Sequence, residues 1–88
     1  MIEIKQNIYK EVLSKLISEI GKSNHISIQT ITGQIDNIEY KFLINAVIYR
    51  NDFGHITDII PIWYEFETIF AGKEVINDFD FSLLRNLI

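Results

Sequence analysis

Apolar residues recur at the spacing of an α-helix in the first part of the chain. Two adjacent rows, each with a period of four residues, contain them: Ile8, Val12, Leu16 and Ile20, and Tyr9, Leu13 and Ile17. Polar side chains fill the other positions, so the pattern predicts an amphipathic helix from Ile4 to Ile20. Gly21 follows directly, and a glycine there supplies the left-handed conformation that ends many helices.

Beyond Gly21 the period falls to two, which is typical of β-strands. Three strands are predicted: His25 to Gly33, Ile38 to Arg50 and His55 to Glu67. Asp36 and Asn37 favour a turn between the first two strands, and the four residues Asn51 to Gly54 favour a hairpin loop between the last two. Pro61 lies inside the third strand. Because proline has no N–H to donate to a ladder, we expect the third strand at the sheet edge there.

The hairpin formed by the second and third strands has apolar side chains on both faces. With Arg50 opposite His55, one face holds Tyr40, Phe42, Ile44, Ala46 and Ile48 with Thr57, Ile59, Pro61 and Trp63. The other face holds Lys41, Leu43, Asn45, Val47 and Tyr49 with Ile56, Asp58, Ile60, Ile62 and Tyr64. The first set is the more apolar and is expected to receive the helix. A single bulge at Pro61 would exchange the two faces beyond it.

The C-terminal quarter predicts shorter elements. A turn at Ala71 to Lys73 leads to a short extended piece, Glu74 to Ile76, and then to a helix from Phe81 to Leu87. Asp78 or Asp80 is the expected N-cap, since a carboxylate accepts hydrogen bonds from the first helical amides. The predicted fold is therefore a single α+β domain, residues 1–88. It has a helix, a three-stranded antiparallel β-meander and a short C-terminal helix (α-β-β-β-α) in two layers.

Composition narrows the setting of this fold. The apolar fraction of 48% and the charged fraction of 23% are those of a folded globular protein. A net charge of −4 argues against nucleic-acid binding, which depends on lysines and arginines that neutralise phosphates. There is no cysteine, no apolar leader and no run that approaches the roughly 20 apolar residues of a membrane span. We therefore expect a cytoplasmic protein without a membrane association.

No residue set in the sequence specifies a reaction, so we predict no enzyme activity, no cofactor and no metal. No serine stands in a nucleophile elbow, and there is no glycine-rich phosphate loop. His25 and His55 begin the first and third strands and could meet at one end of the sheet, but a metal site would need carboxylates there too. Surface histidines are the simpler interpretation. Tyr49, Trp63 and Tyr64 lack the interleaved basic residues of a base-stacking surface, which favours a packing role for these rings.

The second face of the hairpin is the strongest functional signal. Its candidate interaction residues are Leu43, Val47, Tyr49, Asp58, Ile60, Ile62 and Tyr64. Asp58 stands among apolar neighbours and is expected to pair with Arg50 or with a cation of a partner. Three occupants of this face remain open: the C-terminal segment Glu74 to Ile88, a second copy in a homodimer, or a different protein.

The sequence thus favours a protein–protein interaction or self-associating accessory protein without catalysis. One alternative is an acidic inhibitor that mimics nucleic acid, although Glu3, Glu11, Glu19, Asp36, Asp52 and Asp58 are dispersed along the chain. A further alternative is a module that binds a small ligand or nucleotide through His25, His55 and Tyr49.

Two segments near the C-terminus are similar to known sequences. The run from Asp58 to Thr68 and the run from Asn77 to Leu84 resemble short uncharacterised proteins of AT-rich gut bacteria and their phages. The abundance of isoleucine and the scarcity of alanine fit an AT-rich genome. The resemblance implies a small accessory protein of a phage or mobile element, and it implies no activity, cofactor or site.

Overall fold

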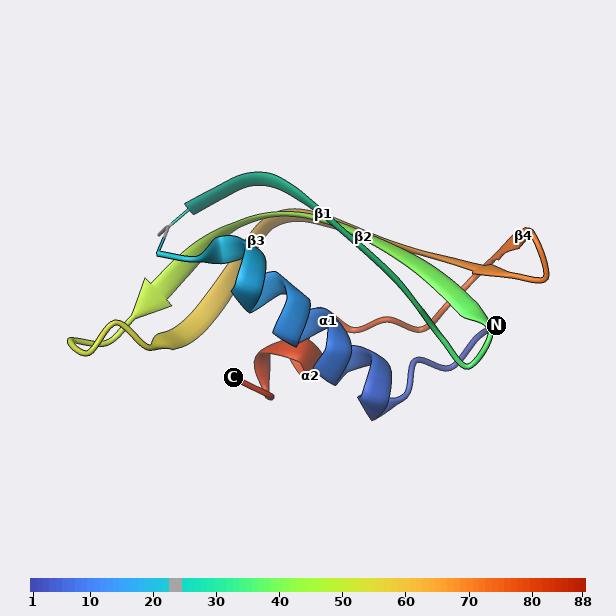
Figure 1. The fold of residues 1–88 in the computed structure, drawn as a ribbon, viewed down its shortest axis with the longest axis horizontal. Helices are drawn as coiled ribbons and strands as arrows, with labels where there is room; N and C mark the ends of the chain where they lie inside the picture. The colour runs from blue at the N-terminus through green and yellow to red at the C-terminus, as the bar shows by residue number, and fades with distance from the viewer. Residues whose placement is uncertain (23–24) are drawn as a thin grey trace.

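A four-stranded antiparallel sheet arches over two helices in the computed structural model, which describes residues 1–22 and 25–88, with the backbone alone for 25–28 (Figure 1). The elements in chain order are α1 (Gln6–Ile20), β1 (His25–Ile35), β2 (Ile38–Arg50), β3 (Ile56–Phe70), β4 (Lys73–Val75) and α2 (Phe81–Arg85). The strand order is β1-β2-β3-β4. The predicted α+β arrangement of helix, antiparallel meander and short helix is confirmed, and a fourth strand extends the predicted three.

The first helix buries the stripe that its spacing predicted. Ile8, Tyr9, Val12, Leu13, Leu16 and Ile20 are its buried residues. The helix begins at Gln6 rather than Ile4, because Lys5 is still extended and the Ile4 N–H donates to Asp78 Oδ1 at 2.6 Å. At the other end Gly21 has φ of 58° and donates its N–H to the Ile17 carbonyl, which confirms the predicted stop.

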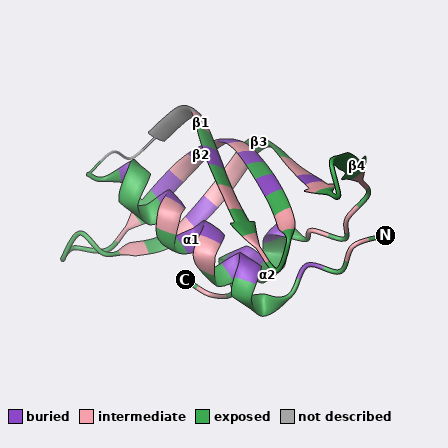
Figure 2. Cartoon of the chain, turned by 45° about the vertical axis from the view of Figure 1, so that its right-hand side comes forward, coloured by how far each residue is buried: buried purple, intermediate pink, exposed green. Residues whose placement is uncertain are grey.

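Strand β2 supplies the centre of the core. Buried and less buried residues alternate along it, as Figure 2 shows in its colours. The buried set, facing the helices, is Tyr40, Phe42, Ile44, Ala46 and Ile48. Phe42, Ile44 and Ala46 are fully inaccessible. This face was the one predicted to receive the helix, and Ala46 leaves room for close packing.

The predicted register of the β2–β3 hairpin was wrong, because the loop is one residue longer than predicted and β3 contains two bulges, at Thr57 and at Ile62. The loop spans five residues, 51–55, so Arg50 pairs with Ile56 rather than His55. Ile56 consequently turns toward the core, whereas the prediction placed it on the other face. A second shift lies at Ile62, which has no partner between the pairs Ala46–Pro61 and Asn45–Trp63. Beyond this bulge the faces of β3 exchange, which was the condition attached to the prediction.

The C-terminal segment packs on the helix side of the sheet. The Phe79 ring stacks on Phe66 of β3, with centroids 4.2 Å apart, and also on Tyr9 of α1 at 5.3 Å. Phe81 and Leu84 of α2 are buried in the same core, and the Asp80 side chain caps α2 by accepting from Ser82 N. Of the three occupants left open for the second face of the hairpin, the C-terminal segment is therefore excluded.

Candidate functional site

The second face of the hairpin has no covering element in the part of the chain that the structure describes (Figure 1). We call this the outer face. Its apolar residues form a stripe along β2 and β3, the outer patch: Leu43, Val47, Tyr49, Ile60, Ile62 and Trp63. Tyr49, Ile62 and Trp63 are 53%, 62% and 47% exposed, and the other three are half-buried. The aromatic residues Tyr49 and Trp63 each expose roughly 100 Å². The whole patch is on the order of 400 Å², a size that on soluble monomers is often functional.

The bulge at Ile62 decides which aromatic residue joins the outer patch. Trp63 pairs with Asn45, which lies between the buried Ile44 and Ala46 and so faces outward. Cross-strand partners share a face, so Trp63 also faces outward. Tyr64 turns inward, where its ring meets Phe81 at 5.0 Å. The prediction had these two residues reversed, and the only sequence signal for the exchange was Pro61.

Of the seven predicted interaction residues, Leu43, Val47, Tyr49, Ile60 and Ile62 lie together on the outer patch. Tyr64 does not, and Trp63 was missed.

Asp58 is bound to another part of the same chain. Its two carboxylate oxygens accept from Arg85 Nε at 2.9 Å and from Arg85 Nη2 at 2.7 Å. The expected pairing with Arg50 is wrong, because the two guanidinium nitrogens Nη1 and Nη2 of Arg50 donate to the carbonyls of Gly54 and Gly21. The hydrogen bond from Arg85 lowers the pKa of Asp58 below its ordinary value. Asp58 therefore connects β3 to α2 through Arg85, and its carboxylate is not free to bind a cation of a partner.

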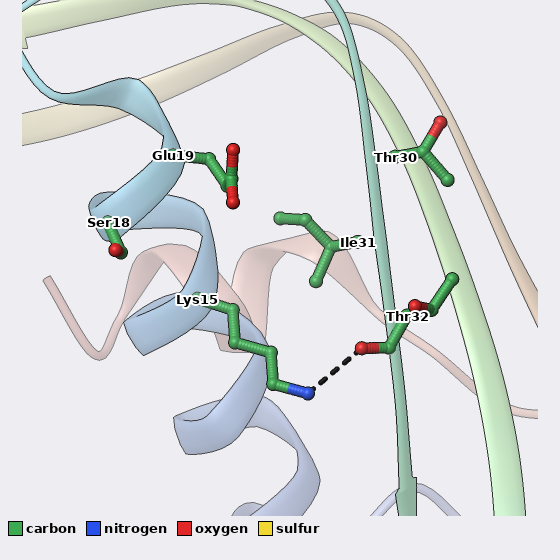
Figure 3. Close-up of a pocket in the computed structure, with 6 residues that line it drawn as sticks. All are labelled: Lys15, Ser18, Glu19, Thr30, Ile31 and Thr32. Atoms are coloured by element: carbon green, nitrogen blue, oxygen red, sulfur yellow. Dashed lines mark hydrogen bonds between the residues drawn. The ribbon is translucent and has the colours of Figure 1, made fainter.

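On the helix side of the sheet, α1 lies next to β1. Between them lies a polar hollow lined by Lys15, Ser18, Glu19, Thr30, Ile31 and Thr32 (Figure 3). The Lys15 ammonium group reaches across it and donates to the Thr32 carbonyl oxygen at 2.9 Å. The same group lies 4.0 Å from Glu11 Oε2 and 5.5 Å from the centre of the Tyr40 ring. These contacts neutralise and occupy the ammonium group, so Lys15 is not available to hold an anionic ligand.

The edge of the sheet at β3 is protected along part of its length. Pro61 cannot donate to an incoming strand, and the bulge at Ile62 interrupts the regular ladder. Farther along, the Asn77 side-chain amide donates to the Phe66 carbonyl at 3.0 Å, and β4 pairs with residues 68–70. Strand addition is thus disfavoured along this part of β3.

The described residues contain no cluster of side chains that suggests a metal site. No group of three or more metal-ligating side chains is found there. His55 is exposed in the hairpin loop, and the side chain of His25 lies outside the described part. Burial raises the pKa of Tyr40, and its hydroxyl donates to Glu11 Oε2 at 2.6 Å. A phenol that is harder to ionise and already bonded is a structural group rather than a general base.

The helix side carries two smaller apolar hollows. One lies beside α2, lined by Ile4, Tyr9, Leu83 and Leu87 together with Gln6 and Asn86. The other lies between α1 and the hairpin loop, lined in part by Leu13, Ile17, Ile56 and Ile88. Leu83 is the most exposed of the apolar side chains in these hollows, at 49%. It offers a reference position on the opposite side of the molecule from the outer patch.

Comparisons with protein-family models, with curated proteins and with solved structures find no match to this chain. Neither of the two described helices has both the length and the apolar character that a membrane span requires.

Proposed function

We propose that this protein is a non-catalytic protein–protein interaction module whose contact surface is the outer patch. The observation behind the proposal is that both helices and the C-terminal segment pack on one face of the sheet. The patch on the other face, with Ile62 and Trp63 at its centre, therefore stays in contact with solvent. Burial of each of these two side chains would contribute about 2 kcal/mol to the free energy of folding, which is a large amount for a domain of this size.

The bulge supports this interpretation. A regular strand would alternate inward and outward positions, but the extra residue at Ile62 allows Ile62 and Trp63 to face outward while Tyr64 still enters the core. Bulges that redirect side chains in this way are common beside functional surfaces. Trp and Tyr are also the residue types most enriched among those that contribute most to binding at interfaces.

The experiment that tests the proposal compares two variants with matched changes of charge. Trp63→Asp alters the centre of the outer patch, and Leu83→Asp alters a side chain of similar exposure, 49% against 47%, on the helix side. Immobilised wild-type protein and both variants are incubated with lysate of the source cells, and retained proteins are identified and then purified for direct binding measurements.

We expect a partner that binds the wild type and Leu83→Asp but binds Trp63→Asp at least about 30-fold more weakly, the loss typical of a central interface residue. A partner lost only by Leu83→Asp would move the contact surface to the helix side and refute the proposal. Far-UV circular dichroism of each variant checks that the fold is intact.

A further inference from the structure

We infer that the outer patch binds a second copy of this chain, sheet to sheet, around a two-fold axis that runs between β2 and β3. The inference rests on the proposed function, since it names the partner of the same surface. It rests also on the way charged and apolar residues are distributed along the two strands.

A two-fold axis parallel to the strands places each residue of β2 over the β3 residue that is paired with it in the sheet. Lys41 of one copy then lies over Glu67 of the second copy, because Lys41 and Glu67 are cross-strand partners. Glu65, the next outward residue of β3, pairs with Leu43 in the sheet, so the same axis places it over Leu43 of the second copy, one outward position from Lys41. Two-fold interfaces use one surface on both copies, so this arrangement makes two such contacts at once.

The same axis matches apolar residues in the other half of the face. Val47 of one copy lies over Ile60 of the second copy, and Trp63 lies over Asn45, whose neighbours across the axis are the apolar residues of the patch. The centre of the contact therefore contains no charged side chain, and the charged residues lie toward its two ends, with Lys41 over Glu67 at one end and Asp58, bound to Arg85 of its own chain, at the other. An apolar centre with a polar rim is the usual anatomy of an interface.

The size of the face fits a reversible dimer. The molecule extends 44 × 22 × 18 Å, and the sheet lies along its longest and shortest dimensions (Figure 1). The rectangle of 44 × 18 Å, about 790 Å², is an upper limit for this face, because these are the dimensions of the whole molecule. Because the sheet arches outward, contact concentrates on the patch of about 400 Å², and we expect dissociation constants between about 10 µM and 1 mM.

The first test is the mass of the pure full-length protein in solution, measured by light scattering and sedimentation equilibrium from about 10 µM to 2 mM. We expect the mass to rise with concentration from 10.3 kDa toward twice that value. Trp63→Asp should weaken the dimer at least about 30-fold. Phe53→Asp is the matched control, because Phe53 is an aromatic residue in the hairpin loop that is 86% exposed. A monomer at all concentrations, or a dimer that Trp63→Asp leaves intact, would overturn the inference.

The second test examines the two-fold geometry. The Lys41→Glu variant has glutamate at both position 41 and position 67, and the Glu67→Lys variant has lysine at both positions. Each variant alone should dimerise more weakly than the wild type, because like charges meet across the axis. Mixed in equal amounts, they should form a heterodimer at least tenfold tighter than either homodimer, since both contacts are then opposite pairs. Mixing that has no effect would overturn the assigned axis.

The two proposals fail in different ways. If the chain is monomeric yet a purified partner binds the wild type and not Trp63→Asp, the second copy is excluded and the outer patch remains the contact surface. If the chain dimerises but Trp63→Asp changes neither the dimer nor any partner, both proposals are overturned.

Discussion

Gly33 is the position where one added methyl group should have the largest effect on stability. It lies in β1 opposite Tyr40 of β2, and the Tyr40 ring crosses directly over its Cα. A Cβ built on Gly33 would overlap Tyr40 Oη, lie 2.5 Å from Tyr40 Cζ and lie 2.6 Å from Lys15 Nζ. Separations this short do not occur between real side chains, so Gly33→Ala must displace the ring.

The ring has little freedom to move. Tyr40 is only 3% exposed, its far side stacks on Phe66 at 5.7 Å, and its hydroxyl is held by Glu11. Overpacking of this kind costs about 1–3 kcal/mol, and loss of the hydrogen bond to a carboxylate adds about 1 kcal/mol. Alanine returns about 0.4–1 kcal/mol by restricting the unfolded chain, because the Gly33 backbone is not in the left-handed region. The expected net loss is about 2 kcal/mol, or about 10 °C in Tm.

The assay is urea denaturation followed by circular dichroism, in dilute protein so that self-association does not contribute. The decisive comparison is Gly33→Ala in a Tyr40→Ala background, where the ring is gone and the added methyl group has room. There the substitution should be neutral or stabilising. If Gly33→Ala is harmless in the wild type, or equally damaging in both backgrounds, the steric explanation is refuted.

Three further predictions concern polar groups. Thr68→Val should cost about 1–3 kcal/mol in urea denaturation, with Thr68→Ser close to neutral, because the buried Thr68 hydroxyl donates to the Val75 carbonyl at 2.6 Å. The pKa of Asp58 is lowered in the folded state, so the stability that Asp58 contributes is present above the ordinary pKa of 3.8 and is lost as the pH falls below that value. Between pH 5 and pH 3 the wild type should therefore lose more stability than Asp58→Asn. Equal losses would refute the role of Arg85. The pKa of Tyr40 is raised in the folded state, so as the pH rises above 10.0 the unfolded chain loses its hydroxyl proton first and the folded state should lose stability. In Tyr40→Phe the loss of stability at alkaline pH should be smaller. A loss equal to that of the wild type would contradict the role given to the Tyr40 hydroxyl.

The elements with strong periodicity could be predicted from the sequence. The helix stripe and the alternation of Phe42, Ile44 and Ala46 each repeat over several turns or pleats, so local pattern and tertiary burial agree. Strand β4 could be predicted only as an extended piece. Three residues are too few for a pattern, and its pairing depends on β3 continuing to Phe70.

The composition of the outer patch was only partly predictable, for a physical reason. Both Trp63 and Tyr64 are suitable for a core, and the sequence does not indicate which one enters it. The choice is made by the C-terminal segment, which brings Phe79 and Phe81 against Tyr64 from some fifteen residues farther along the chain. The pairing of Asp58 with Arg85 was missed for the same reason, since the two are 27 residues apart.

The bulge at Ile62 in β3 consists of this one unpaired residue between two residues that pair with β2. A substitution of Ile62 leaves the bulge in place, whereas deletion of the residue would remove the bulge and restore strict alternation of inward and outward residues along this part of β3. Trp63 would still pair with Asn45, and Glu65 and Glu67 would still face outward, because Pro61 and Trp63 already pair with the adjacent residues Ala46 and Asn45. The outer patch can therefore change at this point both by substitution and by loss of one residue, without a change in the register of the sheet.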